Sequence, residues 1–194
     1  PCLPLLVRIS FFLFRIFSNL SLRRDGTVRR WLLNFFKKYF TDVPACSEPR
    51  RGVATADVTV DASRNLWFRL FVPVTEEADR RRRRRLPVLV FFHGGGFVFL
   101  SADNRQYDSV CRRFAREIPA VVVSVNYRLA PEHRYPSQYE DGFDVLKFLD
   151  GEDYVLPVHA DLSRCFIAGD SAGGNIAHHV TKRWCEWPKF SRLK

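Results

Sequence analysis

The N-terminal region carries apolar side chains at helical spacing. Between residues 3 and 20 the apolar positions recur every three or four residues, as on one face of an α-helix. They are Leu5, Ile9, Leu13, Ile16 and Leu20. Residues 31–40 repeat this pattern before Pro44, with Leu32, Phe35, Phe36 and Tyr39 on one face. We predict two helices here, the first amphipathic and packed on the rest of the chain.

From Val53 onward the apolar period changes to two. Val58 and Val60 alternate with polar residues, and Leu66, Phe68, Leu70 and Val72 do the same after a polar segment at 61–65. Two alternating runs joined by a short polar segment are typical of an antiparallel hairpin.

Three later apolar runs alternate with helical patterns. The runs lie at residues 86–92, 120–125 and 164–168. The first is continuously apolar, as a strand buried on both faces requires. Helical patterns follow each run: around Tyr107, at about 139–149, and from Asn175. The alternation predicts an α/β fold with a mostly parallel sheet behind the antiparallel N-terminal hairpin, with no internal repeat and no second domain.

The basic charge of the chain is concentrated in one run. The net charge is +10 at pH 7, and the arginines at 80–85 supply six of these charges, which leaves an ordinary value of about +4. The run lies where a surface loop would join two strands. No aromatic residues interleave with it as stacking platforms for bases would. We therefore expect a solvated loop and no nucleic-acid partner.

The five cysteines give no sign of a disulfide framework or a metal site. They are widely spaced, with no CxxC pair and no Cys/His cluster at zinc-ligand spacing. The residues are Cys2, Cys46, Cys111, Cys165 and Cys185. We expect free thiols in a reducing compartment, which favours the cytoplasm or the nucleus.

The apolar N-terminus raises the question of a membrane. Arg8 and Arg15 interrupt it, so no apolar stretch approaches the ~20 residues that a spanning helix needs. The stretch at 9–14 is also shorter than the apolar region of a signal peptide, usually about 7 to 15 residues. We expect neither a signal peptide nor a transmembrane helix. Binding to a membrane surface stays open as the less favoured alternative.

A GxSxG pattern stands between the third run and a predicted helix. It consists of Gly169, Asp170, Ser171, Ala172 and Gly173. A serine at a sharp strand-to-helix turn is held in a strained conformation, and the flanking positions must be small because larger side chains would collide. Such a turn aims the N–H of Ala172 and the helix N-terminus at a developing oxyanion. We predict Ser171 as the nucleophile.

Three glycines follow His93 directly after the first buried strand. Consecutive glycines let the backbone approach a substrate closely and present N–H donors, which we expect to be those of Gly94 and Gly95. The spacing fits neither GxxxxGK[ST] nor GxGxxG, so a phosphate-binding loop is not indicated. His93 lies at the strand end and is interpreted as a structural residue that pins the turn.

These motifs resemble one family. His93 to Phe97, residues 126–136 (NYRLAPEHRYP) and residues 169–176 (GDSAGGNI) are similar to the hormone-sensitive-lipase-like α/β-hydrolases. Within that family, residues 22–30 and 57–73 resemble the plant carboxylesterases, whose close relatives include the gibberellin receptors.

The resemblance implies a serine esterase that uses no cofactor and acts on small-molecule carboxylic esters. It implies an N-terminal helical lid segment at 1–50 over a partial hydrolase domain at 51–194. Gly96, Tyr107 and Asp170 are the substrate-pocket candidates.

The chain departs from the family after its nucleophile. The family's triad follows the order Ser, Asp or Glu, then His. After Ser171 this sequence has no Asp and one Glu, Glu186. His178 and His179 lie about 10 to 12 Å along the following helix and cannot face the serine hydroxyl. We therefore expect a chain truncated after the nucleophile helix and inactive on its own.

A non-catalytic hormone receptor on the same fold is the main alternative. In it the pocket would hold a hormone-like carboxylate. Gibberellin receptors resemble this chain but carry Ser where it has Gly96 and Ala172, and RAPE where it has LAPE at 129–132. These differences favour the esterase, whereas Tyr107 falls at the position of a receptor ligand-binding tyrosine. A fragment with only a structural role is a third class. The sequence indicates no oligomeric state.

Overall fold

A computed structural model describes residues 4–74, 85–152, 154–187 and 191–193 of the 194-residue chain. The chain divides into two compact units, Pro1–Phe40 and Thr41–Lys194. The predicted arginine loop lies outside the described residues except for Arg85. In the part of the chain that the structure describes, no helix has the length and apolar character needed to cross a bilayer.

The N-terminal unit contains the two predicted helices. α1 spans Leu5–Ser21 and α2 spans Arg30–Phe36, followed by a short wider helical turn at Lys37–Thr41. The segment between α1 and α2 turns at Asp25, whose carboxylate accepts hydrogen bonds from the N–H and the hydroxyl of Thr27 at 2.9 and 2.6 Å. The predicted change from helix to polar turn to helix is confirmed.

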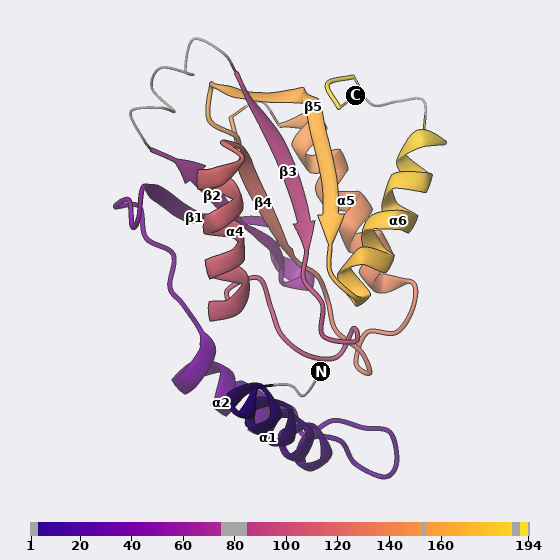
Figure 1. Cartoon of the computed structure of the whole chain (residues 1–194). Helices are drawn as coiled ribbons and strands as arrows, with labels where there is room; N and C mark the ends of the chain where they lie inside the picture. The colour runs from indigo at the N-terminus through magenta and orange to yellow at the C-terminus, as the bar shows by residue number, and fades with distance from the viewer. Residues whose placement is uncertain (1–3, 75–84, 153, 188–190, 194) are drawn as a thin grey trace. The chain divides into compact units, whose positions relative to one another are not determined.

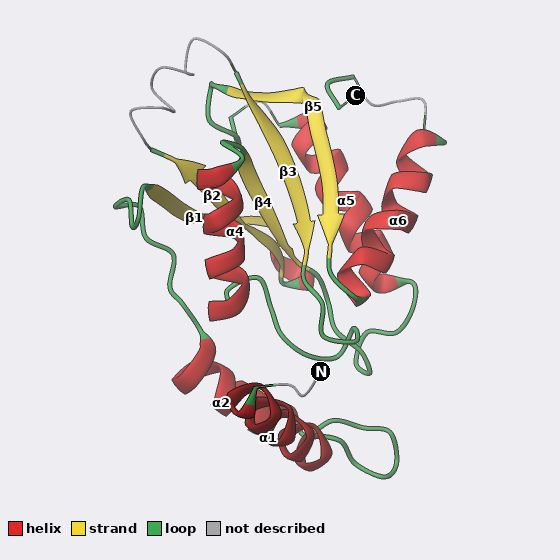
Figure 2. Cartoon of the chain, viewed as in Figure 1, coloured by secondary structure: helices red, strands yellow, loops and turns green. Residues whose placement is uncertain are grey.

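Five strands form one mixed sheet among the described residues (Figure 2). They are β1 (Val53–Asp61), β2 (Leu66–Pro73), β3 (Leu86–Phe92), β4 (Val121–Asn126) and β5 (Ala160–Gly169), in the spatial order β1-β2-β4-β3-β5. β3 pairs in parallel with β4 and β5, whereas β2 pairs antiparallel with β1 and β4. β2 therefore runs opposite to the other strands, as the predicted N-terminal hairpin requires.

Helices cover both faces of the sheet. α4 (Arg105–Glu117) lies on one face, and α5 (Ser137–Gly151) and α6 (Ala172–Cys185) lie on the other (Figure 1). Neighbouring residues of β3 serve the two faces: Phe92 packs in the core beneath α5 and α6, and Phe91 packs in the core beneath α4. The continuous apolar run thus forms a strand buried on both sides, as predicted.

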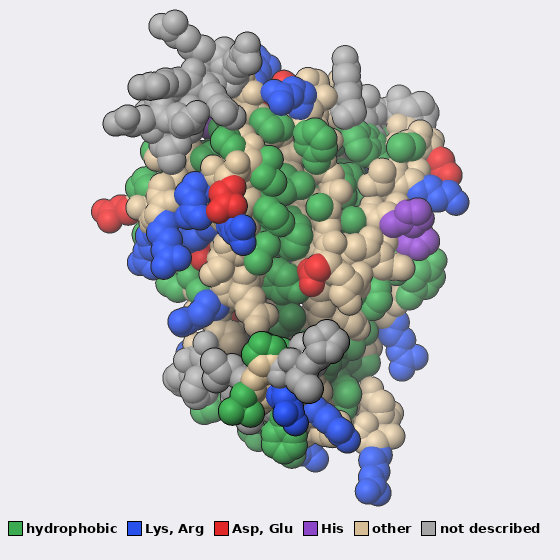
Figure 3. All heavy atoms as spheres, in the orientation of Figure 1, with side chains coloured by type: hydrophobic (Ala, Val, Ile, Leu, Met, Phe, Trp, Pro, Cys, Tyr) green, Lys and Arg blue, Asp and Glu red, His purple; other side chains and the backbone are tan. Residues whose placement is uncertain are grey.

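The sheet is not fully covered over β3 and β5, beside α4 (Figure 3). Hydrophobic side chains gather on the surface beside α4, over β3 and β5 (Figure 3), and Phe166 of β5 is 59% exposed. β5 pairs only with β3, so its other edge has no neighbouring strand among the described residues.

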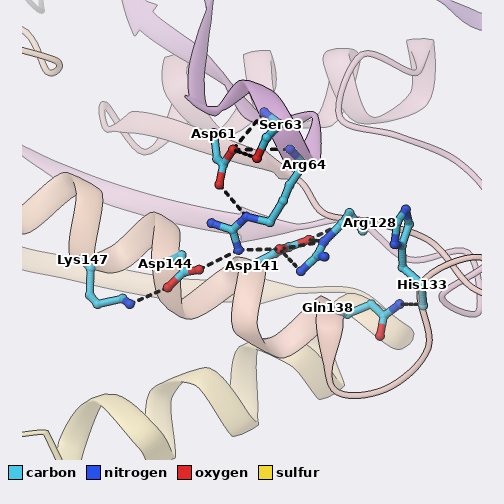
Figure 4. A network of polar contacts seen from close by, with 9 residues as sticks. All are labelled: Asp61, Ser63, Arg64, Arg128, His133, Gln138, Asp141, Asp144 and Lys147. Atoms are coloured by element: carbon cyan, nitrogen blue, oxygen red, sulfur yellow. Dashed lines mark hydrogen bonds and ion pairs between the residues drawn. The ribbon is translucent and has the colours of Figure 1, made fainter.

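A polar network fastens the corner of the hairpin to α5 (Figure 4). The guanidinium of Arg64 contacts Asp61 at 2.6 Å and Asp144 at 2.8 Å. The guanidinium of Arg128, just after β4, forms a paired contact with the fully buried carboxylate of Asp141 at 2.7 to 3.0 Å. Because a buried charge is costly unless paired, these contacts fix where the chain leaves β4.

Candidate active site

Ser171 occupies a sharp turn between β5 and α6. Its backbone angles are φ 50° and ψ −117°. A non-glycine residue in such a conformation costs about 1–3 kcal/mol, and such costs cluster at functional sites. The predicted strand-to-helix geometry is confirmed. We call residues 169–173 the serine turn.

Backbone packing fixes the serine turn from both sides. A Cβ atom on Gly169 would lie 2.4 Å from the carbonyl oxygen of Gly173, and one on Gly173 would lie 2.0 Å from the carbonyl oxygen of Phe92. Real Cβ atoms do not approach backbone atoms so closely. The predicted need for small residues on either side of Ser171 therefore has a direct cause: the turn packs on itself and on the end of β3.

The chain turns equally sharply after β3. We call residues 93–96 the glycine turn. Gly95 and Gly96 have φ of 110° and 62°, in the range that favours glycine. A Cβ atom on Gly95 would lie 2.2 Å from the carbonyl oxygen of Phe99, whose own N–H donates to the carbonyl of Gly95 at 2.9 Å. Only glycine fits at position 95.

Tyr107 and Asp170 lie beside the glycine turn and occupy one of its N–H groups. The N–H of Gly94 donates to the Tyr107 hydroxyl oxygen and to the Asp170 carboxylate, both at 2.8 Å. The Tyr107 hydroxyl donates to the other carboxylate oxygen at 3.0 Å. The N–H of Gly94, expected to face an oxyanion, is therefore already committed. Among the described residues, the N–H groups of Gly95 and Ala172 have no acceptor.

The substrate-pocket candidates differ in exposure. Tyr107 is 8% exposed, and Asp170 and Gly96 are exposed at the surface. Burial, and then the negative charge of Asp170, raise the pKa of the Tyr107 hydroxyl. Tyr107 is therefore protonated near neutral pH and able to donate.

His93 belongs to the core of the glycine turn. It is fully buried, its ring stacks on that of Tyr127 with centroids 4.2 Å apart, and its Nδ1 lies 2.8 Å from the carbonyl oxygen of Gly94. The Tyr127 hydroxyl donates to the His93 carbonyl at 2.6 Å. These contacts agree with a structural role for His93. Sequence reasoning missed Tyr127, since nothing in the pattern links it to a residue 34 positions earlier.

The histidines of α6 point to other partners. The ring of His179 packs edge-to-face on Tyr139, whose hydroxyl donates to Asn175 at 2.7 Å. Within the described ranges no hydrogen bond joins Ser171 to a histidine, and no cluster of His, Cys, Asp or Glu there could hold a metal ion. An open groove of about 540 Å³ runs along β5 and α6, lined by Ala168 and His178 among others, but Ser171 does not line it.

Comparison with protein families places these turns in a known context. The profile of the alpha/beta hydrolase fold matches residues 89–190, which include both turns. The profile of the carboxylesterase family matches residues 41–131.

The similar curated proteins include both receptors and esterases. Gibberellin receptor GID1C of Arabidopsis thaliana is 41% identical over 89% of this chain and 52% of the receptor. Carboxylesterase 20 of the same plant is 36% identical over 86% of this chain and 51% of that protein. The 3-O-acetylpapaveroxine carboxylesterase CXE2 of Papaver somniferum is 41% identical over 68% and 45%. The chain spans about half the length of these relatives.

Solved esterases share the fold. An esterase of Pyrobaculum calidifontis matches all of this chain and 56% of its own, with a TM-score of 0.65 and 29% identity. The ester-hydrolase EH1AB1 from the metagenome of Lake Arreo matches 95% of this chain and 56% of its own at the same TM-score and identity.

Proposed function

The chain belongs to the carboxylesterase-type α/β-hydrolase family, and on that premise we propose that it carries the nucleophile and the oxyanion donors of a serine carboxylesterase. The observation that supports this most directly is the strained conformation of Ser171 at the start of α6, where φ is 50°. Backbone strain held by surrounding packing favours a functional role over an ordinary turn.

Ser171 is the proposed nucleophile toward a small-molecule carboxylic ester. Its Oγ forms a bond to the ester carbonyl carbon, the carbonyl oxygen gains the negative charge, and the carbon–alkoxy bond then breaks to leave an acyl-enzyme. Water hydrolyses the acyl-enzyme and restores the hydroxyl. We propose that a histidine outside these 194 residues accepts the serine proton and passes it to the leaving alcohol, so that this chain alone is inactive.

The proposed oxyanion donors are the N–H groups of Ala172 and Gly95. Ala172 is the first residue of α6, where the helix dipole also favours negative charge. Gly95 adopts a conformation that only glycine tolerates. Gly94 was expected as a donor, but its N–H is bonded to Asp170 and Tyr107, so we assign it to holding the glycine turn. Gly96 borders the proposed pocket.

The test is a chimera of this chain followed by the C-terminal half of Carboxylesterase 20. We expect hydrolysis of p-nitrophenyl butyrate by the chimera, with an initial burst from the acyl-enzyme. Ser171→Ala should lower kcat by at least about 10⁴-fold, as loss of a triad member typically does. Ser63→Ala is the matched control, because Ser63 lies at the hairpin corner, and it should leave kcat unchanged. Turnover that survives Ser171→Ala would contradict the proposal.

A second candidate function is a non-catalytic gibberellin-type receptor. The 41% identity to GID1C supports it, because this equals the identity to CXE2. The chain nevertheless has Gly96 and Ala172 at two positions where such receptors, which otherwise resemble it, carry Ser. These differences favour the esterase. Calorimetric titration of the chimera with a gibberellin separates the two candidates. Hormone binding without a serine-dependent burst would favour the receptor.

Two further expectations stay proposals. Residues 1–50 are proposed as a helical lid over the pocket. A cytoplasmic or nuclear location is supported by the thiols, since Cys46, Cys111, Cys165 and Cys185 are all free.

A further inference from the structure

Tyr107, a residue of α4, forms hydrogen bonds to both the glycine turn and the serine turn. We propose that Tyr107 is a positioning residue that, together with Asp170, fastens the glycine turn to the serine turn. The expected effect on catalysis rests on the proposed function, whereas the positioning role itself rests on the hydrogen bonds described below. It gives Tyr107 a role inside the protein in place of one as a contact for substrate.

The hydrogen bonds form a closed triangle. One corner is the N–H of Gly94, which is shared between the Tyr107 oxygen and one carboxylate oxygen of Asp170 at 2.8 Å each. The Tyr107 hydroxyl closes the triangle by donating to the other carboxylate oxygen at 3.0 Å. Hydrogen bonds to a charged acceptor are roughly twice as strong as neutral ones. The triangle therefore joins a turn after β3, a turn after β5 and a helix.

Gly94 has no room for a side chain beside the Asp170 carboxylate. A Cβ atom there would lie 2.6 Å from a carboxylate oxygen of Asp170. The first glycine of the turn is thus needed so that the Asp170 carboxylate can reach the backbone. Because the N–H of Gly94 points to Asp170, the His93–Gly94 peptide is held in one orientation. The next peptide, which carries the N–H of Gly95, is held at its carbonyl end, because the carbonyl oxygen of Gly94 lies 2.8 Å from Nδ1 of His93.

The rest of α4 holds the Tyr107 hydroxyl in place. The neighbouring residue Asp108 is buried, its carboxylate contacts Arg112 at 2.7 Å, and it lies 3.7 Å from a guanidinium nitrogen of Arg69 on β2. Arg69 is itself held by the carboxylate of Asp57 on β1 at 2.7 and 2.8 Å. Buried paired charges of this kind have few alternative arrangements. The helix is fixed to the sheet one residue from Tyr107.

Tyr107 is suited to a permanent contact. Its ring packs against Phe91 and His93, with ring centroids 6.1 and 5.5 Å apart. Burial, and then the charge of Asp170, raise the pKa of its hydroxyl. The hydroxyl therefore keeps the proton that it donates to Asp170 across the neutral range.

The experiment observes the Gly94 amide itself in the 194-residue chain. His93–Gly94 is the only His–Gly pair in the sequence. Labelling histidine with ¹³C at the carbonyl and glycine with ¹⁵N therefore selects this one amide by NMR. For Tyr107→Phe and Asp170→Asn we expect the Gly94 proton to move upfield. We also expect its exchange with solvent to accelerate about tenfold, because local opening becomes easier.

Tyr139→Phe is the matched control. It also removes one tyrosine hydroxyl, which donates to Asn175 at the start of α6, but it does not touch the triangle. Its Gly94 exchange should stay within about twofold of the unsubstituted chain. An unchanged Gly94 signal in Tyr107→Phe and Asp170→Asn would overturn the proposal. Equal acceleration in all three variants would also overturn it, since that indicates general loosening. If Tyr107→Phe does not fold, Asp170→Asn decides.

A kinetic measurement adds the catalytic consequence. In the chimera with Carboxylesterase 20, Tyr107→Phe should lower kcat about tenfold with little change in KM, because the N–H groups of the turn act in the transition state. A chimera without any turnover would refute the proposed function and leave the amide measurement to decide this inference.

Discussion

The serine turn (residues 169–173) and the glycine turn (residues 93–96) lie against each other at the ends of β5 and β3, but different interactions fix them. Gly169 and Gly173 hold the serine turn by backbone packing, within five consecutive residues and against Phe92. The glycine turn depends on side chains from other elements, above all Tyr107 of α4 and Tyr127 after β4. The first turn is thus fixed mainly by close backbone packing, on itself and on the end of β3, whereas the second depends also on side-chain hydrogen bonds from other elements.

The largest effect of an added methyl group in the serine turn is expected at Gly173. Gly173→Ala would place Cβ 2.0 Å from the Phe92 carbonyl oxygen. We expect the free energy of unfolding to fall by about 3 kcal/mol or more, because the clash is with backbone that cannot move aside. The gain of about 1 kcal/mol in helix propensity does not offset this. Urea unfolding followed by circular dichroism measures the change.

The next residue provides the control for that substitution. Gly174 is also in α6, but a Cβ atom there would lie 3.2 Å from the nearest atom, the carbonyl oxygen of Gly169. Gly174→Ala should change the free energy of unfolding by no more than about 1 kcal/mol, since a small shift relieves the contact and helix propensity improves. Equal losses in Gly173→Ala and Gly174→Ala would show that the close packing at Gly173 is not what fixes the turn.

A small effect is also expected at the exposed end of the glycine turn. Gly96 has φ 62°, but no atom lies within 4 Å of the position that a Cβ atom would take there. Gly96→Ala should therefore cost only the left-handed backbone conformation, about 1 kcal/mol. Gly96→Asn should cost less, because asparagine tolerates that conformation better. A loss in Gly96→Ala as large as that in Gly173→Ala would mean that position 96 is also limited by packing, as position 95 is.

The same distinction explains which parts of the fold could be predicted from the sequence. The predicted strand at 86–92 coincides with β3, because a strand buried on both faces is apolar throughout. The strand predicted at 164–168 is longer in the structure, where β5 begins at Ala160. Its first residues include Asp161 and Ser163, which show no apolar pattern and lie where β5 pairs with the start of β3 through an irregular register.

The candidate site divides in the same way. Ser171 and its flanking glycines could be predicted because the GxSxG pattern between an apolar run and a helical pattern is itself typical of such a turn. That the N–H of Gly94 is already hydrogen-bonded could not be predicted, since its acceptors Tyr107 and Asp170 lie 13 and 76 residues away. A glycine-rich pattern predicts that N–H groups are available to a ligand, but only tertiary structure decides which of them another side chain already occupies.

Covalent trapping is the most direct test of Ser171 as the nucleophile. The chimera with Carboxylesterase 20 would be treated with a p-nitrophenyl phosphonate ester and digested with trypsin. Cleavage after Arg164 and Lys182 gives the peptide 165–182, in which Ser171 is the only serine. We predict one phosphonyl adduct on this peptide, located at Ser171 and absent in Ser171→Ala. No adduct on the peptide, or an adduct that persists in Ser171→Ala, would contradict the assignment.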